Sequence, residues 1–109
     1  MIESLVGNST AEKVLLYIAN YGEGHISGIA DTFGISKSQV RKQILRLEKG
    51  GILVARFAGN SKMFQINPRY SFKKELLTLL EKALGLLSSK EIEKYYRQRR
   101  RPRRTGKEL

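Results

Sequence analysis

The sequence predicts an α+β fold that is mainly α-helical, with one two-stranded hairpin between helices. Three observations predict it. Apolar residues recur at helical spacing in several segments. Capping-box patterns, a serine followed three residues later by Glu or Gln, begin at Ser9, Ser36 and Ser88. Two strand-like runs, "ILVARF" and "KMFQI", flank the turn signal "AGNS".

The first predicted helix begins at Ser9, after a short lead-in of residues 1–8. The Ser9 hydroxyl is expected to accept the backbone N–H of Glu12, and the Glu12 carboxylate to reach back. "NYGEG" ends this helix, because its glycines can adopt a positive φ. A short extended "HIS" follows, and Ser27 is the predicted cap of the second helix, "GIADTF".

The third predicted helix begins at Ile35 and Ser36, where Ser36 and Gln39 form a capping box. It ends at the Gly50-Gly51 pair. Spacing of i, i+4 and i+7 predicts a buried stripe of Val40, Ile44 and Leu47. In the two strands that follow, Phe57 and Phe64 are expected to pack inward.

Two further helices are predicted after Pro68, which ends the strand pairing. The longer one runs from about Ser71 to Leu86, and a shorter one near residues 89–98 starts at the Ser88 capping box. The tail "RQRRRPRRTGKEL" has low complexity and is expected to be disordered when alone.

The formal charge of +11 is concentrated in two segments. Residues 37–62 carry seven Lys and Arg and one acidic residue, and residues 97–109 carry the same numbers. The rest of the chain is close to neutral. Two basic patches on a neutral body indicate a protein that binds a polyanion. The alternative is a solubilising surface, but solvated faces usually mix charges of both signs.

The predicted order of elements is that of a winged helix-turn-helix. "HISGIADTFGISKSQVRKQILRLEKGGILVARFAGNSKMFQINP" resembles the winged-helix transcriptional regulators of the ArsR-like superfamily, over roughly residues 10–85. The family pattern S-x-x-x-V-x-x-x-L-x-x-L-E-x-x-G-L-L-V, a wing and N-P is represented by Ser36, Val40, Ile44, Leu47, Glu48, Gly51, Ile52, Leu53, Val54, Asn67 and Pro68. Together with the apolar and basic patterns that follow it, this predicts a DNA-binding domain at 1–70, dimerisation helices at 71–98 and a basic tail at 99–109.

The N-terminal turns of the third helix and the wing are expected to contact double-stranded DNA. At about 100° per residue, the face opposite the buried stripe holds polar and cationic side chains. The predicted DNA-binding residues are Ser36, Lys37, Ser38, Gln39, Arg41, Lys42, Arg46, Arg56, Asn60, Ser61 and Lys62. Gln39 either pairs with adenine or completes its capping box. Leu45 projects near this face, and its role stays open.

The tail is expected to add phosphate contacts outside the main site. Its arginines are Arg97, Arg99, Arg100, Arg101, Arg103 and Arg104. Such a segment makes binding strong, non-specific and sensitive to salt. Structured RNA and an acidic protein partner are alternative targets.

The helix from Ser71 is apolar on two sides, which predicts a homodimer. The predicted interface residues are Phe72, Leu76, Leu77, Leu80, Ala83, Leu84 and Leu87. Alternatively, the first helix and residues 89–98 cover the second side.

The remaining composition argues against catalysis. The chain has no Cys and one His, His25, so neither a metal site nor a Ser-His-Asp set is expected. We expect no enzymatic activity and no cofactor, and neither a membrane span nor a secretory signal. The lack of Cys fits a reducing cytoplasm. The leading hypothesis is therefore a dimeric DNA-binding repressor; the alternatives are an RNA-binding or ribonucleoprotein module and a protein-interaction adaptor.

Overall fold

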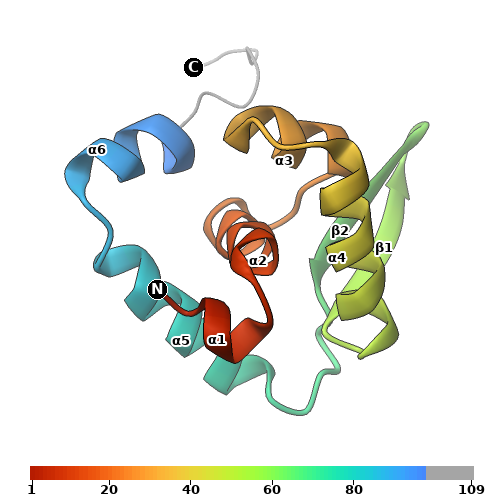
Figure 1. The fold of residues 1–109 in the computed structure, drawn as a ribbon. Helices are drawn as coiled ribbons and strands as arrows, with labels where there is room; N and C mark the ends of the chain where they lie inside the picture. The colour runs from red at the N-terminus through yellow and green to blue at the C-terminus, as the bar shows by residue number, and fades with distance from the viewer. Residues whose placement is uncertain (98–109) are drawn as a thin grey trace, which may run out of the picture.

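The computed structural model describes residues 1–97, in which helices surround one central helix and a hairpin lies to one side (Figure 1). The elements are α1 (Glu3–Val6), α2 (Ser9–Tyr21), α3 (Ile26–Phe33), α4 (Lys37–Lys49), β1 (Leu53–Ala58), β2 (Ser61–Ile66), α5 (Lys73–Gly85), α6 (Ser89–Glu91) and the π-helical turn η1 (Ile92–Tyr96). This part of the chain is thus α+β and mainly helical. An antiparallel hairpin follows four helices, an order compatible with a winged helix.

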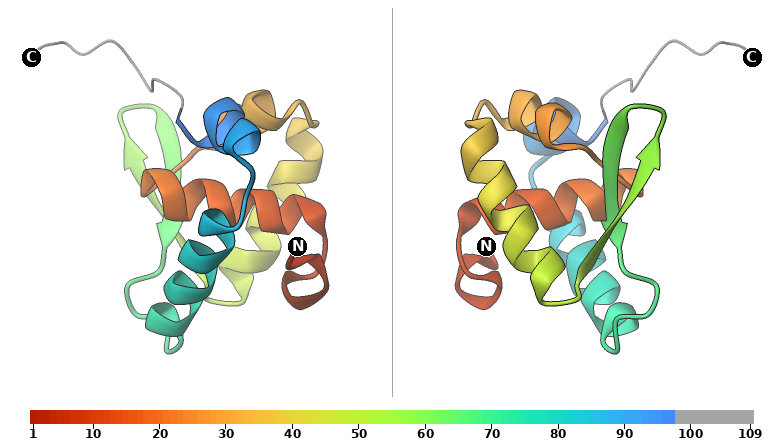
Figure 2. Two further views of the ribbon diagram at one scale, coloured as in Figure 1. Left: turned by 90° about the vertical axis from the view of Figure 1, so that its left-hand side faces the viewer. Right: turned by 90° about the vertical axis from the view of Figure 1, so that its right-hand side faces the viewer.

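Helix α2 forms the centre of the core. Residues 14–18 are consecutive and all buried, so α2 contacts neighbours around most of its circumference. Both views of Figure 2 show α2 crossing the middle of the molecule, with α5 on one side and α4 on the other. The inward stripe predicted for α4 is confirmed, because Val40, Ile44 and Leu47 are all buried in the same cluster. Burial of this stripe leaves the opposite side of α4 free.

The N-caps of α2 and α3 differ from those predicted. The cap of α2 is Asn8, whose side chain accepts the N–H of Ala11, so Ser9 is already helical. The cap of α3 is His25, not Ser27. Its Nδ1 accepts the N–H of Gly28 at 2.8 Å. A Cβ at Gly28 would lie 2.6 Å from the imidazole, so only glycine leaves room for this ring.

Residues 1–8 are more than a lead-in, since they contain α1. The Glu12 carboxylate does not complete a capping box with Ser9. It accepts the N–H of Ile2 at 2.7 Å and so ties the start of the chain to α2. By contrast, the capping boxes at Ser36 and Ser88 are confirmed, each with both of its hydrogen bonds.

The hairpin has the predicted turn at Gly59 and Asn60, where Gly59 has a φ of 65°. The extended segment before α3 contributes a single bridge, in which Gly24 pairs with Phe64. Phe64 is buried as predicted, but Phe57 is 72% exposed, so its predicted inward packing is wrong. Both rings lie on one face of the hairpin, and Phe57 lies too close to the tip to reach the core.

Helix α5 is covered mainly from within the chain. Leu80 is 0% exposed and Ala83 is 3% exposed, and both belong to the core around α2. Their predicted place in a dimer interface is therefore wrong. The other predicted interface leucines are half-buried against the same core: Leu76, Leu77, Leu84 and Leu87. Phe72 and the neighbouring Leu86 are 62% and 65% exposed.

The last described residues pack against α2 and α3. The segment predicted as a helix near 89–98 is helical over residues 89–96, α-helical at Ser89–Glu91 and π-helical in η1. The Tyr21 hydroxyl donates to the carbonyl oxygen of Tyr95 at 2.7 Å, and Asn20 donates to that of Tyr96 at 2.8 Å. Tyr96 is buried, and this burial raises the pKa of its hydroxyl.

Candidate nucleic-acid interface

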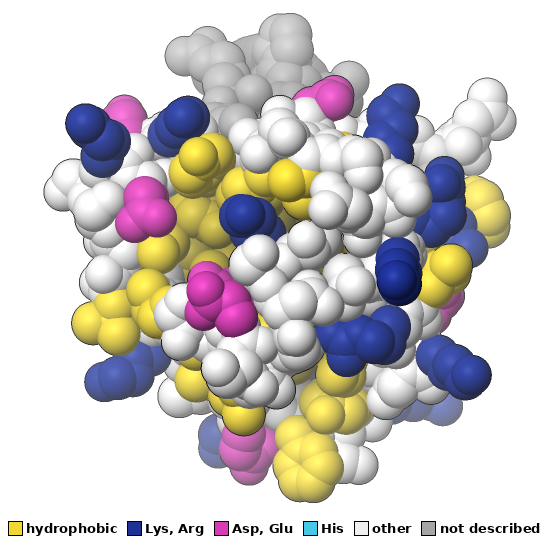
Figure 3. All heavy atoms as spheres, viewed as in Figure 1, with side chains coloured by type: hydrophobic (Ala, Val, Ile, Leu, Met, Phe, Trp, Pro, Cys, Tyr) yellow, Lys and Arg dark blue, Asp and Glu magenta, His cyan; other side chains and the backbone are white. Residues whose placement is uncertain are grey.

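The outer face of α4 is the main concentration of exposed cations within residues 1–97. Residues 36–39, 41 and 42 are all exposed, as are 45, 46 and 49. Figure 3 shows Lys and Arg side chains spread over the right-hand side of the view, where α4 and the hairpin lie. Four cations of this face form neither an ion pair nor a side-chain hydrogen bond with any described residue: Lys37, Arg41, Lys42 and Lys49. Their charge is therefore available to an anionic ligand.

Gln39 is already engaged at the start of α4. Its Oε1 accepts from the backbone N–H and from the hydroxyl of Ser36, at 3.3 and 3.2 Å. A bidentate contact with adenine requires both the Oε1 and the Nε2 of this amide. Gln39 must therefore leave its capping box before it can read a base in that way.

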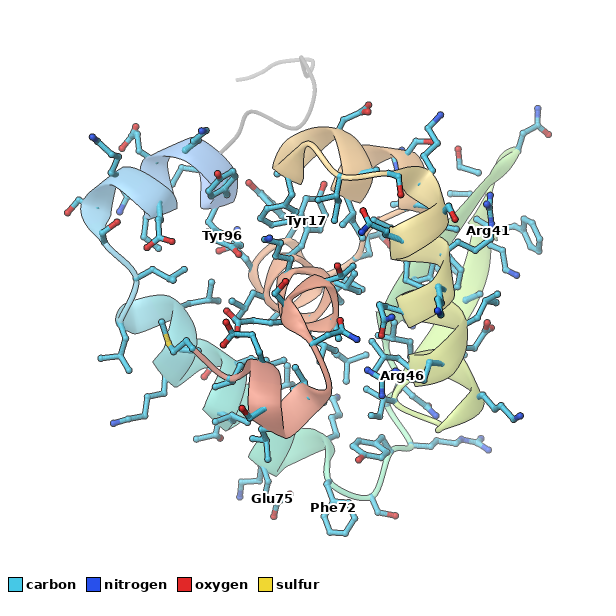
Figure 4. All side chains as sticks on the ribbon, in the orientation of Figure 1. Tyr17, Arg41, Arg46, Phe72, Glu75 and Tyr96 are labelled. Atoms are coloured by element: carbon cyan, nitrogen blue, oxygen red, sulfur yellow. The ribbon has the colours of Figure 1, made fainter. Side chains whose placement is uncertain are left out.

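Arg46 is turned away from the outer face. Its Nη2 donates to the carbonyl oxygen of Val6 at 2.7 Å, and its Nε donates to Gln43 at 3.0 Å. In Figure 4, Arg46 lies on the α1 side of α4 and Arg41 on the hairpin side. Arg46 thus connects α4 to the end of α1, and a contact with a ligand would compete with this bond.

Arg56 on β1 is likewise occupied. Its Nη2 and Nε both donate to Oε1 of Glu23, at 2.6 and 3.1 Å. Glu23 precedes the Gly24 bridge to β2, which places its carboxylate beside the hairpin. Sequence reasoning missed this partner, because 33 residues separate it from Arg56. The ion pair neutralises most of the charge that Arg56 would bring to the hairpin.

The tip of the hairpin carries the other predicted contacts. Asn60, Ser61 and Lys62 are exposed around the tight turn. The Nζ of Lys62 lies 5.5 Å from the centroid of the Phe64 ring, a cation–π contact that leaves the ammonium at the surface. Lys62 therefore joins the unpaired cations of α4 as a fifth available charge.

A shallow depression lies between β2 and the start of α3. Its volume is about 270 Å³, and its lining residues are His25, Ile26, Ser27, Ser61 and Lys62. No acidic side chain lines it. Because Nδ1 of His25 accepts a hydrogen bond, the proton of a neutral imidazole must lie on Nε2. His25 is thus a helix cap.

The predicted tail contacts fall almost entirely outside the described residues. Arg97 is exposed, and its guanidinium lies 3.9 Å from the Glu93 carboxylate. The other predicted tail residues, Arg99, Arg100, Arg101, Arg103 and Arg104, lie beyond residue 97.

Within residues 1–97, no group of three or more His, Cys, Asp or Glu side chains is arranged to hold a metal ion. None of the helices in this part of the chain is both long enough and apolar enough to cross a membrane. Comparison with protein-family models and with curated proteins finds no match to the chain.

Proposed function

We propose that this chain is a winged helix-turn-helix protein that binds double-stranded DNA sequence-specifically and represses transcription. Helix α4 enters the major groove, and the β1–β2 hairpin is the wing, which lies along the backbone or in the minor groove. The observation that carries the proposal is the outer face of α4, where exposed cations have no acidic partner among residues 1–97. Unpaired charge on a structured face is typical of phosphate and base recognition.

The dimensions of α4 suit this role. Its 13 residues span about 20 Å, and a B-DNA major groove about 12 Å wide admits one helix. The stripe of Val40, Ile44 and Leu47 anchors the helix in the core, so its outer side chains project from a rigid support. Lys37, Ser38 and Lys42 then lie where base edges and flanking phosphates would be.

Arg46 and Arg56 already bind other residues of the chain, which leaves fewer side chains to contact DNA directly. Lys42 and Arg41 are the best candidates for guanine, because the side chain of neither forms an ion pair or a hydrogen bond with a described residue. Arg46 and Arg56 support the fold first and contact phosphate only at the cost of an existing bond. Leu45 is 52% exposed on the same face and can meet a thymine methyl group.

We also propose that two copies of the chain bind one site. The surface that favours a dimer includes the exposed Phe72 and Leu86 and the half-buried leucines of α5. Figure 3 shows hydrophobic side chains reaching the surface along the left and the bottom of the view, where α5 lies. Dimers of this class read two half-sites with related sequences.

The test is selection of bound fragments from a random pool of duplex DNA. The expected result is an enriched motif with two half-sites, and the purified protein should prefer it to random duplex by about 10³-fold or more. RNA of matched length serves as the competitor. Equal or tighter binding of RNA contradicts the proposal and favours an RNA-binding module. If no motif is enriched and the protein binds no duplex, the proposal fails and a protein-interaction adaptor is favoured.

A further inference from the structure

Phe57 has an unusual position on the hairpin. It is 72% exposed and stands directly opposite Lys62 in the strand register. Only the pair Ala58 and Ser61 separates it from the turn. Phe64, on the same face but nearer the helices, is 2% exposed. The Phe64 ring therefore belongs to the core, whereas the Phe57 ring is exposed to solvent.

The surroundings of Phe57 indicate which ligand it suits. A protein partner would need a continuous apolar surface, whereas the residues beyond Phe57 are small or polar from Ala58 to Ser61. Its cross-strand neighbour, on the same face of the hairpin, is the cation Lys62. An aromatic ring beside a cation is complementary to a nucleic acid, whose bases present apolar faces and edges between phosphates.

The hairpin also has a suitable position beside α4. The two elements pack against each other, and the tip of the hairpin extends beyond the helices (Figure 1). A duplex resting on the outer face of α4 would pass this tip. The minor groove that follows a bound major-groove segment is the part of the duplex within reach of a wing.

We propose that Phe57 inserts into the minor groove next to the segment held by α4 and packs against the bases there, opening one base step. This inference rests on the proposed function and identifies the base-contacting residue of the wing. Lys62 holds a phosphate beside the opened step. Pyrimidine–purine steps open most easily, so the wing should favour such a step at this position.

The test compares Phe57→Ala with Leu5→Ala on the duplex that the wild-type protein selects. Leu5 lies on α1 and is 70% exposed, so both variants remove an exposed apolar side chain and both should unfold at the wild-type temperature. Phe57→Ala should bind about tenfold more weakly, with an unchanged salt dependence because no cation is lost. Leu5→Ala should bind the duplex like the wild type.

A second measurement reports the opened step directly. 2-Aminopurine, placed at successive positions flanking the α4 contact, should become more fluorescent at one step when the wild-type protein binds. The increase should persist with Leu5→Ala, weaken with Phe57→Leu and vanish with Phe57→Ala.

Two results would overturn the inference. If Phe57→Ala matches Leu5→Ala in affinity and in 2-aminopurine signal, Phe57 does not contact bases, although the proposed function stands. If the wild-type protein binds no duplex at all, the proposed function fails and this inference fails with it.

Discussion

Lys42→Glu is the most direct test of the outer face of α4. Lys42 is exposed, lies in the first half of the helix and forms no ion pair with a described residue. Replacing it removes one contact with guanine or phosphate and adds a repulsive charge. A lost base contact costs about 1–3 kcal/mol, so binding of the selected duplex should weaken roughly 5- to 150-fold.

The salt dependence of DNA binding gives a second quantity to measure. Five cations of α4 and the hairpin form neither an ion pair nor a side-chain hydrogen bond within residues 1–97: Lys37, Arg41, Lys42, Lys49 and Lys62. If each neutralises one phosphate, log Kobs should fall with log[salt] at a slope of about −4.5. Between 50 and 200 mM salt, the wild-type protein should then lose affinity by about 500-fold. For Lys42→Glu the slope should shrink to about −3.6 or less.

Fluorescence anisotropy of labelled duplex, titrated at several salt concentrations, measures both quantities. Lys82→Glu is the matched control, because it makes the same change in net charge on an exposed position of α5, across α2 from α4 (Figure 1). Screening beyond about 10 Å at 0.1 M salt should leave its binding near that of the wild type. Equal affinity and equal slope for the two variants would refute the assignment of α4 as the DNA-contacting helix.

Three other predictions follow from the packing. Arg46→Ala should lower the free energy of unfolding by about 1 kcal/mol in urea denaturation and speed hydrogen exchange in α1, because the bond to Val6 is lost. Leu80→Ala should cost about 2–5 kcal/mol, whereas Leu86→Ala should leave the unfolding midpoint unchanged and weaken the dimer in sedimentation experiments. Burial raises the pKa of Tyr96, while an unfolded tyrosine titrates near pH 10. Stability should therefore fall as the pH rises above about 10, and Tyr96→Phe should remove this part of the loss in urea melts. The argument for Arg46 is contradicted if Arg46→Ala leaves hydrogen exchange in α1 unchanged, and the argument for Leu80 if Leu80→Ala unfolds at the wild-type urea concentration. The argument for Tyr96 is contradicted if Tyr96→Phe loses as much stability above pH 10 as the wild type.

The local features of the fold were predictable from short stretches of sequence. The capping box of Ser36 and Gln39, the stripe of α4 and the hairpin turn are as expected, because each depends on residues only a few positions apart. The same reasoning misplaced the caps of α2 and α3 by one and two positions. Asn caps a helix as well as serine does, and in this chain the His25 imidazole accepts the same kind of bond, so a pattern of residue types does not rank neighbouring candidates.

Which predicted contact residues are free depends on the tertiary structure. Val6 lies 40 residues from Arg46, and Glu23 lies 33 residues from Arg56, so neither partner follows from the surrounding sequence. For the same reason, the periodicity of α5 shows an apolar helix but does not separate the core residue Leu80 from the exposed Leu86.

The sequence by itself thus determined the order of elements from α2 onward, the buried stripe of α4 and the location of the positive charge. These follow from helical and strand periodicity and from the spacing of charged residues, which are properties of the chain alone. Only the tertiary structure decided that two arginines are occupied, that Leu80 is core and that Phe57 is exposed. The reason is that burial and pairing depend on how distant segments approach one another, and that approach is set by packing of the whole core.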